Sequence, residues 1–247
     1  MTSKYSKAAA VIGMAILAGS AYAQKAGDTT LYVGVAYIKQ DVSVGDLTAS
    51  AAAAYKPTYQ GFVNGASAEA SDETTVKFNV THMVTNNIAV ELAAGIAPRI
   101  QLDIATDATG NHKNAAEADV QTPSLLAKYF FFTPDVKLRP YVGLGATYVR
   151  FTDVKVHDDG PTGTIHRLAG YSASVDSTWA PVYNVGVSYK LNEQWSIGTS
   201  FSYIPIDTKM TFKGPGASNA SKVDDVTTKG DVTFNSMIYA VNVGYTF

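Results

Sequence analysis

The final eleven residues of the chain, 237–247, alternate strictly between two kinds of side chain. Every odd-numbered residue from Met237 to Phe247 is apolar, and the residues between them are mostly small or polar. Because successive side chains of a β-strand point to opposite faces, this segment is expected to be a strand with one apolar face. The same alternation recurs along the chain, and it limits the fold more than any other feature.

Eight segments beyond residue 23 carry this alternation, and eight strands are enough for the smallest closed barrels. They lie at about 30–44, 73–83, 88–96, 124–132, 137–153, 178–191, 195–206 and 237–247. The predicted connections are three short turns and four long loops. The turns are near residues 86, 134 and 192, and the loops are at about 45–72, 101–123, 154–177 and 207–233. Short turns on one side and long loops on the other are typical of outer-membrane barrels.

The apolar face of these strands lacks Lys, Glu and Asn, whereas the opposite face carries them. A soluble barrel of the lipocalin type would turn its polar face outward to water and its apolar face inward. The apolar face is instead suited to hydrocarbon, so we expect it to face the lipid. Aromatic side chains form girdles at both edges of a transmembrane barrel. The predicted strand ends carry Tyr129, Tyr189, Trp195, Tyr203, Tyr239 and Tyr245. The sequence predicts an all-β fold, an eight-stranded antiparallel transmembrane β-barrel with short periplasmic turns and long extracellular loops.

The first 23 residues have the parts of a secretory signal peptide. Lys4 and Lys7 make a basic start, residues 8–17 are almost all apolar, and residues 21–23 form a small-x-small cleavage site. Such a segment is too short for a membrane-spanning helix. We expect cleavage before Gln24 and a single barrel domain over residues 24–247.

Composition argues against several classes of function. The chain contains no cysteine, so it has no disulfide framework and no thiolate metal site. Its net charge of −2 argues against nucleic acid as a partner. We expect no cofactor and no metal.

The segment from Thr122 to Phe151 resembles the OmpW family of small outer-membrane proteins. Members carry a Pro-Thr-Leu-x-x-x-Tyr-type strand and, one short turn later, a Pro-Tyr-Val-Gly-x-Gly-x-x-Tyr strand. The corresponding residues are Pro123, Tyr129, Pro140, Tyr141, Val142, Gly143, Gly145 and Tyr148. Segments 86–92, 177–181, 191–195 and 203–206 also resemble the family. The similarity covers nearly the whole mature chain, and the departures lie in the loops, at 49–55 and 165–177.

The resemblance implies an eight-stranded barrel with a narrow, largely apolar lumen in the bacterial outer membrane. It implies passive uptake of small hydrophobic molecules, with lateral exit through the wall as a possible route; Pro98 and Pro181 are candidates for openings between strands. The aromatic ending Tyr245-x-Phe247 is similar to the signal that the barrel-assembly machinery reads during insertion. The expected partners are outer-membrane lipids and lipopolysaccharide, the assembly machinery and small hydrophobic solutes.

Six inward positions are candidates for the lining of an apolar conduit. They are Tyr32, Ile38, Leu126, Phe130, Tyr141 and Ile204. The alternative is that these side chains simply fill the barrel, because an eight-stranded interior is just wide enough to be packed.

Four charged residues are predicted to point inward within the membrane: Lys77, Glu91, Lys128 and Lys190. Buried charges are costly unless they are paired, so Glu91 is expected to neutralise one or more of the lysines in an interior plug. A proton or ion relay is the alternative. Inward glycines at five positions are expected to relieve crowding along the wall.

Two other functions remain open. A small-barrel enzyme would need a catalytic group at the outer rim, where the candidates are His157, Asp158, Asp159, His166 and Ser172. No motif arranges these residues, so we expect no enzymatic activity. A surface receptor or adhesin would act through the long loops.

Overall fold

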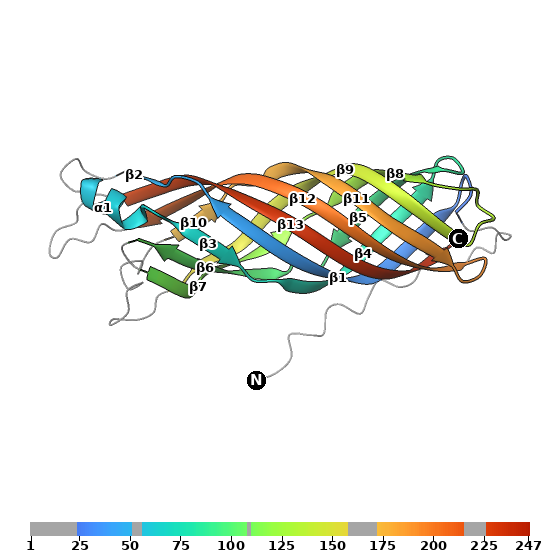
Figure 1. Cartoon of the computed structure of the whole chain (residues 1–247), viewed down its shortest axis with the longest axis horizontal. Coiled ribbons are helices and arrows are strands. Elements are labelled where there is room, and N and C mark those ends of the chain that lie inside the picture. The colour runs from blue at the N-terminus through green and yellow to red at the C-terminus, as the bar shows by residue number, and fades with distance from the viewer. Residues whose placement is uncertain (1–23, 51–55, 108–109, 158–171, 215–225) are drawn as a thin grey trace, which may run out of the picture.

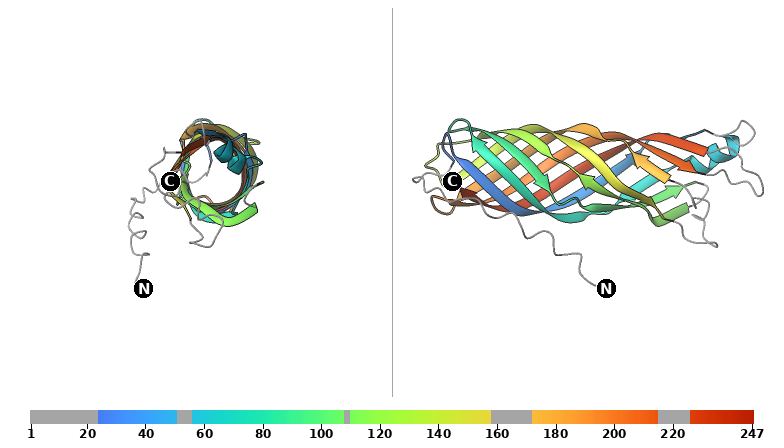
Figure 2. Two further views of the ribbon diagram at one scale, coloured as in Figure 1. Left: turned by 90° about the vertical axis from the view of Figure 1, so that its left-hand side faces the viewer. Right: turned by 180° about the vertical axis from the view of Figure 1, so that it is seen from behind.

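The fold is an elongated, closed antiparallel barrel whose strands are tilted relative to its long axis (Figures 1 and 2). A computed structural model describes residues 24–50, 56–107, 110–157, 172–214 and 226–247. Eight strands form the ring: β1 (Thr29–Val44), β4 (Glu73–Met83), β5 (Ile88–Gly95), β8 (Ser124–Phe130), β9 (Leu138–Val156), β11 (Thr178–Lys190), β12 (Trp195–Gly214) and β13 (Val226–Thr246). The predicted signal peptide lies outside the described residues.

The ring closes by pairing the first barrel strand with the last. Around the barrel the order is β1, β4, β5, β8, β9, β11, β12, β13 and back to β1. The β1–β13 ladder runs without a register shift from Thr30↔Thr246 to Val44↔Val232. Closure leaves the membrane-spanning strands without a free edge, and Figure 2 shows the resulting ring end-on.

All eight predicted strands are confirmed. Six of them agree with the prediction to within three residues at each end, whereas β12 and β13 extend much further toward the long-loop end. The three short turns are also confirmed, between β4 and β5, β8 and β9, and β11 and β12.

The prediction that the four long connections are loops is wrong over much of their length, because strands continue the wall beyond the membrane. Segment 45–72 contains β2 (Thr48–Ser50), α1 (Lys56–Val63) and β3 (Ser67–Ala70), and 101–123 is mostly a hairpin of β6 (Arg99–Thr106) and β7 (Gly110–Gln121). β10 (Ser172–Val175) pairs with β12. The hairpin joins the barrel through pairing of β7 with β9 and of β6 with β3. We call this part of the wall the extension.

The outward face changes solvent along the long strands, as β1 and β12 show. On β1 the outward residues Val33, Val35 and Tyr37 are exposed and apolar, and the next outward positions are Lys39 and Asp41. On β12, Trp195 and Ile197 are likewise followed by Asp207 and Lys209. Hydrocarbon therefore covers the short-turn part of the wall and water covers the extension.

Aromatic pairs mark both edges of this apolar belt. Near the chain end, Tyr245 packs edge-on against Trp195 and Phe247, each with ring centroids 5.0 Å apart. Near the extension, Tyr239 lies 5.2 Å from Phe201 and 6.4 Å from Tyr37. These rings occupy the positions of interfacial girdles.

The helix α1 has eight residues. None of the described helices is long and apolar enough to cross a membrane.

Inward glycines make room for large side chains in the narrow barrel. A Cβ added at Gly186 would lie 2.5 Å from the ring of Tyr141 and 2.6 Å from the carbonyl oxygen of Thr199. A Cβ at Gly244 would collide with the ring of Tyr32. These two contacts support the prediction that inward glycines relieve crowding at the wall.

Gly186→Ala should destabilise the barrel by about 1–3 kcal/mol, because the new methyl group displaces Tyr141 or the β12 backbone. Urea unfolding in lipid vesicles measures the loss. Gly61→Ala in α1 is the matched control, since nothing lies within 4 Å of its added Cβ. Equal stability of the two variants would contradict a tightly packed interior.

Val80→Arg should cost about 2–4 kcal/mol, because it places a guanidinium on the hydrocarbon-facing side of β4 near mid-membrane. Thr74→Arg, on the same face of β4 but at the end nearest the extension, should cost about 0–1 kcal/mol. Unfolding titrations in vesicles compare the two variants. A larger loss of stability in Thr74→Arg than in Val80→Arg would contradict the position assigned to the apolar belt.

Candidate functional site: the layered interior

A buried arginine ties together the short-turn end of the barrel. The side chain of Arg139, on β9, is among the largest that are fully buried. Its guanidinium donates to the backbone carbonyl oxygens of Gln24 (2.7 Å), Asn86 (2.6 Å), Phe131 (3.3 Å) and Phe132 (3.2 Å). These carbonyls come from the segment before β1 and from two short turns. Arg139 thus joins three chain segments into one seal.

Aromatic and amide groups complete this seal. The side-chain amide of Gln24 donates to the hydroxyl groups of Tyr32 (3.2 Å) and Ser188 (2.5 Å). The rings of Phe130 and Tyr141 lie 4.9 Å apart and pack with two further buried apolar residues. Arg139 lies 5.2 Å over the ring of Phe130. The floor of the lumen is therefore closed by packed side chains.

A charged layer lies directly above the floor. The Glu91 carboxylate accepts hydrogen bonds from Lys128 Nζ (2.6 Å), Thr81 Oγ1 (2.7 Å) and Asn79 Nδ2 (2.9 Å). The side chains of Glu91 and Lys128 are each 5 % exposed. Lys128 Nζ also lies 4.5 Å over the ring of Tyr141. This pair resists separation, because losing one partner leaves a buried, uncompensated charge.

The structure divides the four predicted plug charges among three places. Glu91 and Lys128 form the ion pair. Lys77 points into the lumen one inward position above Asn79, and no hydrogen bond or ion pair joins its ammonium group to another described residue. Lys190 is the last residue of β11, at the short-turn end, where its backbone N–H donates to Lys137.

An apolar layer fills the lumen from the charged layer into the extension. Its buried members are Ile100, Leu102, Ala116, Val120, Leu126, Val149, Ala180, Val182, Ile204, Ile206, Met210, Val232 and Phe234. The extension reverses the membrane pattern, with apolar side chains inside and charged ones outside. Water outside the wall explains the reversal, since apolar residues there can leave water only by facing inward.

The predicted lining residues all face inward and are buried, but they belong to different levels. Leu126 and Ile204 lie in the apolar layer, whereas Phe130 and Tyr141 lie in the floor. Tyr32 contacts Gln24 at the base, and Ile38 is buried on β1 outside both clusters. The six residues therefore do not form one continuous lining.

Among the described residues, two of the spaces within this packing are small cavities. One of about 20 Å³ lies in the apolar layer between residues that include Ile100, Val120 and Phe234. The other, of about 10 Å³, lies beside Tyr32 and Glu91 in the polar part. Each has room for about one or two water molecules.

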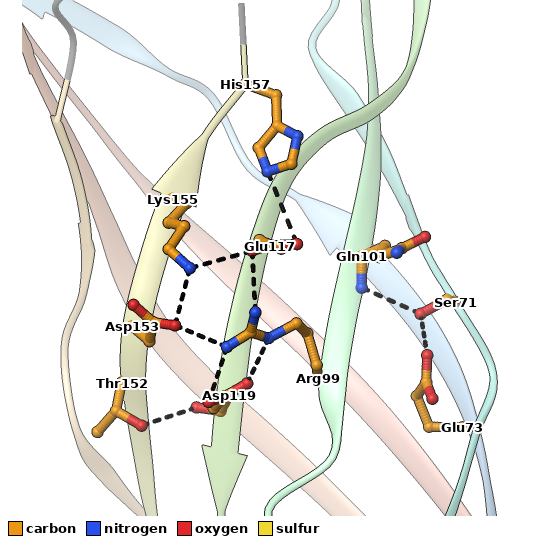
Figure 3. Close-up of polar contacts among 10 residues, drawn as sticks. All are labelled: Ser71, Glu73, Arg99, Gln101, Glu117, Asp119, Thr152, Asp153, Lys155 and His157. Carbon is orange, nitrogen blue, oxygen red and sulfur yellow. Dashed lines mark hydrogen bonds and ion pairs between the residues drawn. The ribbon is translucent and has the colours of Figure 1, made fainter. Parts of the chain in front are cut away.

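A separate ion-pair cluster lies on the outer wall of the extension (Figure 3). Arg99 of β6 contacts Asp119 (2.7 Å) and Glu117 (3.2 Å) of β7 and Asp153 (2.6 Å) of β9. Lys155 reaches Asp153 at 3.0 Å. The hydrogen bond between Lys155 and Asp153 lowers the pKa of Asp153 and raises the pKa of Lys155. We call these residues the Arg99 clamp, because they join the β6–β7 hairpin to β9.

The clamp also accounts for one residue that had been a catalytic candidate. His157 Nε2 lies 3.6 Å from a carboxylate oxygen of Glu117. Ser172 begins β10, and its hydroxyl donates to the Lys213 carbonyl (3.4 Å). Asp158, Asp159 and His166 lie outside the described residues. Across the described part of the chain, no three His, Asp or Glu side chains are grouped to hold a metal.

Comparison with known proteins gives this barrel its family. A model described as the OmpW family matches residues 25–247. The chain belongs to the OmpW family. Outer membrane protein W of Salmonella typhimurium is 31 % identical over 208 residues, covering 84 % of this chain and 87 % of the relative. The Escherichia coli protein of the same name is 31 % identical over 215 residues, covering 87 % and 90 %.

Solved structures agree with this membership. The outer membrane protein OprG of Pseudomonas aeruginosa superposes with a TM-score of 0.74 at 26 % identity, covering 91 % of this chain and 97 % of that one. Outer membrane protein W of Escherichia coli gives a TM-score of 0.52 at 27 % identity, covering 90 % and 99 %. This OmpW-family member is therefore an outer-membrane β-barrel with periplasmic short turns and extracellular long connections.

Several interior residues of this OmpW-family barrel were not predicted. Arg139 shares the inward parity of Tyr141 on β9, so the alternation contained a signal for its position. Ile206, Val232 and Phe234 lie in or beside a segment predicted to be a loop, and their inward role is visible only once the reversed pattern of the extension is known.

Glu91→Gln should destabilise the barrel by about 3–5 kcal/mol, because Lys128 would keep a buried charge without its partner. The double variant Glu91→Leu/Lys128→Met should recover much of this loss, since it removes both charges. Urea unfolding in vesicles gives both values. A double variant as unstable as the single one would contradict the pairing.

Arg99→Ala should loosen the β6–β7 hairpin, seen as faster amide hydrogen exchange in β6 and β7 with no change in β4. The lowered pKa of Asp153 stabilises the clamp above its ordinary value of 3.8, and this contribution is lost as pH falls through the folded-state pKa. The raised pKa of Lys155 stabilises it below 10.5, with loss as pH rises through the folded-state pKa. The protection factors of β6 and β7 in the wild type, which are corrected for the intrinsic pH dependence of amide exchange, should thus change little between these limits and fall at high salt. Unchanged exchange in Arg99→Ala would rule out a clamp.

Proposed function

We propose that this barrel is a passive outer-membrane channel for small hydrophobic molecules. The observation that carries the proposal is the apolar layer, which continues from the extension down to Leu126 within the membrane. Lipopolysaccharide headgroups are polar and hinder apolar solutes. An apolar interior that reaches beyond the membrane on the extracellular side lowers this barrier. The resemblance to the OmpW family implies the same role.

The floor supports a route that does not lead straight into the periplasm. Arg139 is buried in the floor with Phe130 and Tyr141, and Glu91 and Lys128 are buried in the charged layer directly above it. An apolar solute gains nothing by displacing hydrogen-bonded charges, and the floor also excludes ions and water. A solute that reaches Leu126 is therefore expected to leave through the wall into the bilayer.

Two interruptions in the wall support lateral exit. The β5–β8 ladder ends at Ala93↔Ser124 and pairing resumes where Val120 N–H donates to the Pro98 carbonyl oxygen (3.0 Å), so the interruption lies just before Pro98. The β11–β12 ladder ends at Tyr183↔Tyr203, two residues after Pro181. Pro181 remains paired with Ala146 on its β9 side, so only one of its edges is open.

The test is flux into proteoliposomes of an apolar solute and of an ion of similar size. Ile206→Lys places a charge in the apolar layer and should slow apolar flux severalfold. Asp207→Lys, the adjacent outward position, is the control and should leave flux unchanged. Heat-dependent gel mobility verifies that both variants are folded. Equal flux in wild type and Ile206→Lys, or ion flux as fast as apolar flux, would contradict the proposal.

A further inference from the structure

Lys77 occupies an open position on the inner wall. Its register partners are Gly34 on β1 and Gly95 on β5, so neither neighbouring strand covers it with a side chain. The lysine is half-buried and shares the inward face of Asn79. Its side chain is therefore not fully enclosed by the packing of the inner wall.

The layer around Lys77 carries an excess positive charge. The charges that act on it are Glu91, which attracts it, and Lys128, which repels it. Two ammonium groups thus face one carboxylate. Glu91 already accepts hydrogen bonds from Lys128, Thr81 and Asn79, and its nearest ion-pair partner is Lys128. Lys77 is left without an anionic partner among the described side chains.

Lys77 lies where the charged layer meets the apolar layer. β4 runs toward the short turns, so Lys77 is one inward step further from them than Asn79. On β8, Leu126 is likewise one inward step above Lys128, and it belongs to the apolar layer. Ala93, paired with Asn79 and diagonal to Lys77, packs against the same layer. A cation thus lies at the lower end of an apolar interior.

We propose that Lys77 binds the carboxylate of an amphiphilic solute, a monocarboxylic acid whose apolar chain or ring lies in the apolar layer. The carboxylate would neutralise the excess charge, and a charge-assisted hydrogen bond is stronger at a partly buried position than in bulk water. This inference rests on the proposed function and narrows its substrate class.

The apolar layer must rearrange to admit the body of such a ligand, because its cavity measures only about 20 Å³. Met210 lines that cavity, and an unbranched thioether side chain adapts readily to a new neighbour. Phe151, Val175 and Phe212 are only partly buried against the layer. The body of the ligand would extend from Leu126 and Ala93, the members of the layer beside Lys77, toward these side chains while its carboxylate reaches Lys77.

The experiment compares a photoreactive diazirine decanoic acid with the matching diazirine decanol on the full-length mature barrel in phosphatidylcholine nanodiscs. Peptide mass spectrometry separates labels on inward residues, such as Leu126 and Met210, from labels on lipid-facing residues such as Val142. In wild type, inward labelling by the acid should exceed that by the alcohol about tenfold, the ratio expected for one buried ionic hydrogen bond.

Lys77→Met should abolish the preference for the acid, whereas Lys77→Arg should retain it. Lys209→Met, an outward lysine of the extension, is the matched control and should behave as wild type. Heat-dependent gel mobility identifies folded variants. Inward labelling by both probes, with no effect of Lys77→Met, would overturn this inference and leave the proposed function standing. Labelling confined to lipid-facing residues would overturn both.

Discussion

The ladder that closes β1 onto β13 is the interaction on which the rest of this barrel depends. It runs from Thr30 to Val44, and it removes the two edges that an open sheet would expose to hydrocarbon. Each unpaired backbone group in lipid costs several kcal/mol, so a sheet of this kind spans the membrane only when closed. Closure with eight strands leaves a narrow interior, and the tight contact of Gly186 with Tyr141 is one consequence.

The long wall strands pass through two solvents, and this explains which parts of the fold were predictable. In the membrane, Val33, Val35 and Tyr37 alternate with small or polar inward residues, which is the pattern that outer-membrane strands are known for. In the extension the polarity reverses: Ile206 faces inward and Asp207 faces water. A search for outward apolar residues assigns such a segment to a loop, although its backbone continues as a strand.

The interior was predictable only in part, because alternation gives the face of a residue and not its height in the barrel. Leu126 and Phe130 both face inward as predicted, yet they belong to the apolar layer and to the floor. The tilt and stagger of the strands decide these levels, and one strand read alone does not contain them. The carbonyl partners of Arg139 come from segments far apart in sequence, so its role as a seal depends on the assembled fold.

The change of solvent along the wall is tested most directly by spin-label accessibility along β12 in lipid vesicles. The chain has no native cysteine, so single cysteines can be placed at Ile197, Phe201, Asp207 and Lys209. Labels at the first two positions should be relaxed by oxygen, which partitions into hydrocarbon, and labels at the last two by a water-soluble nickel complex. Strong relaxation by the nickel complex at all four positions would contradict a wall that is lipid-covered below and water-covered above.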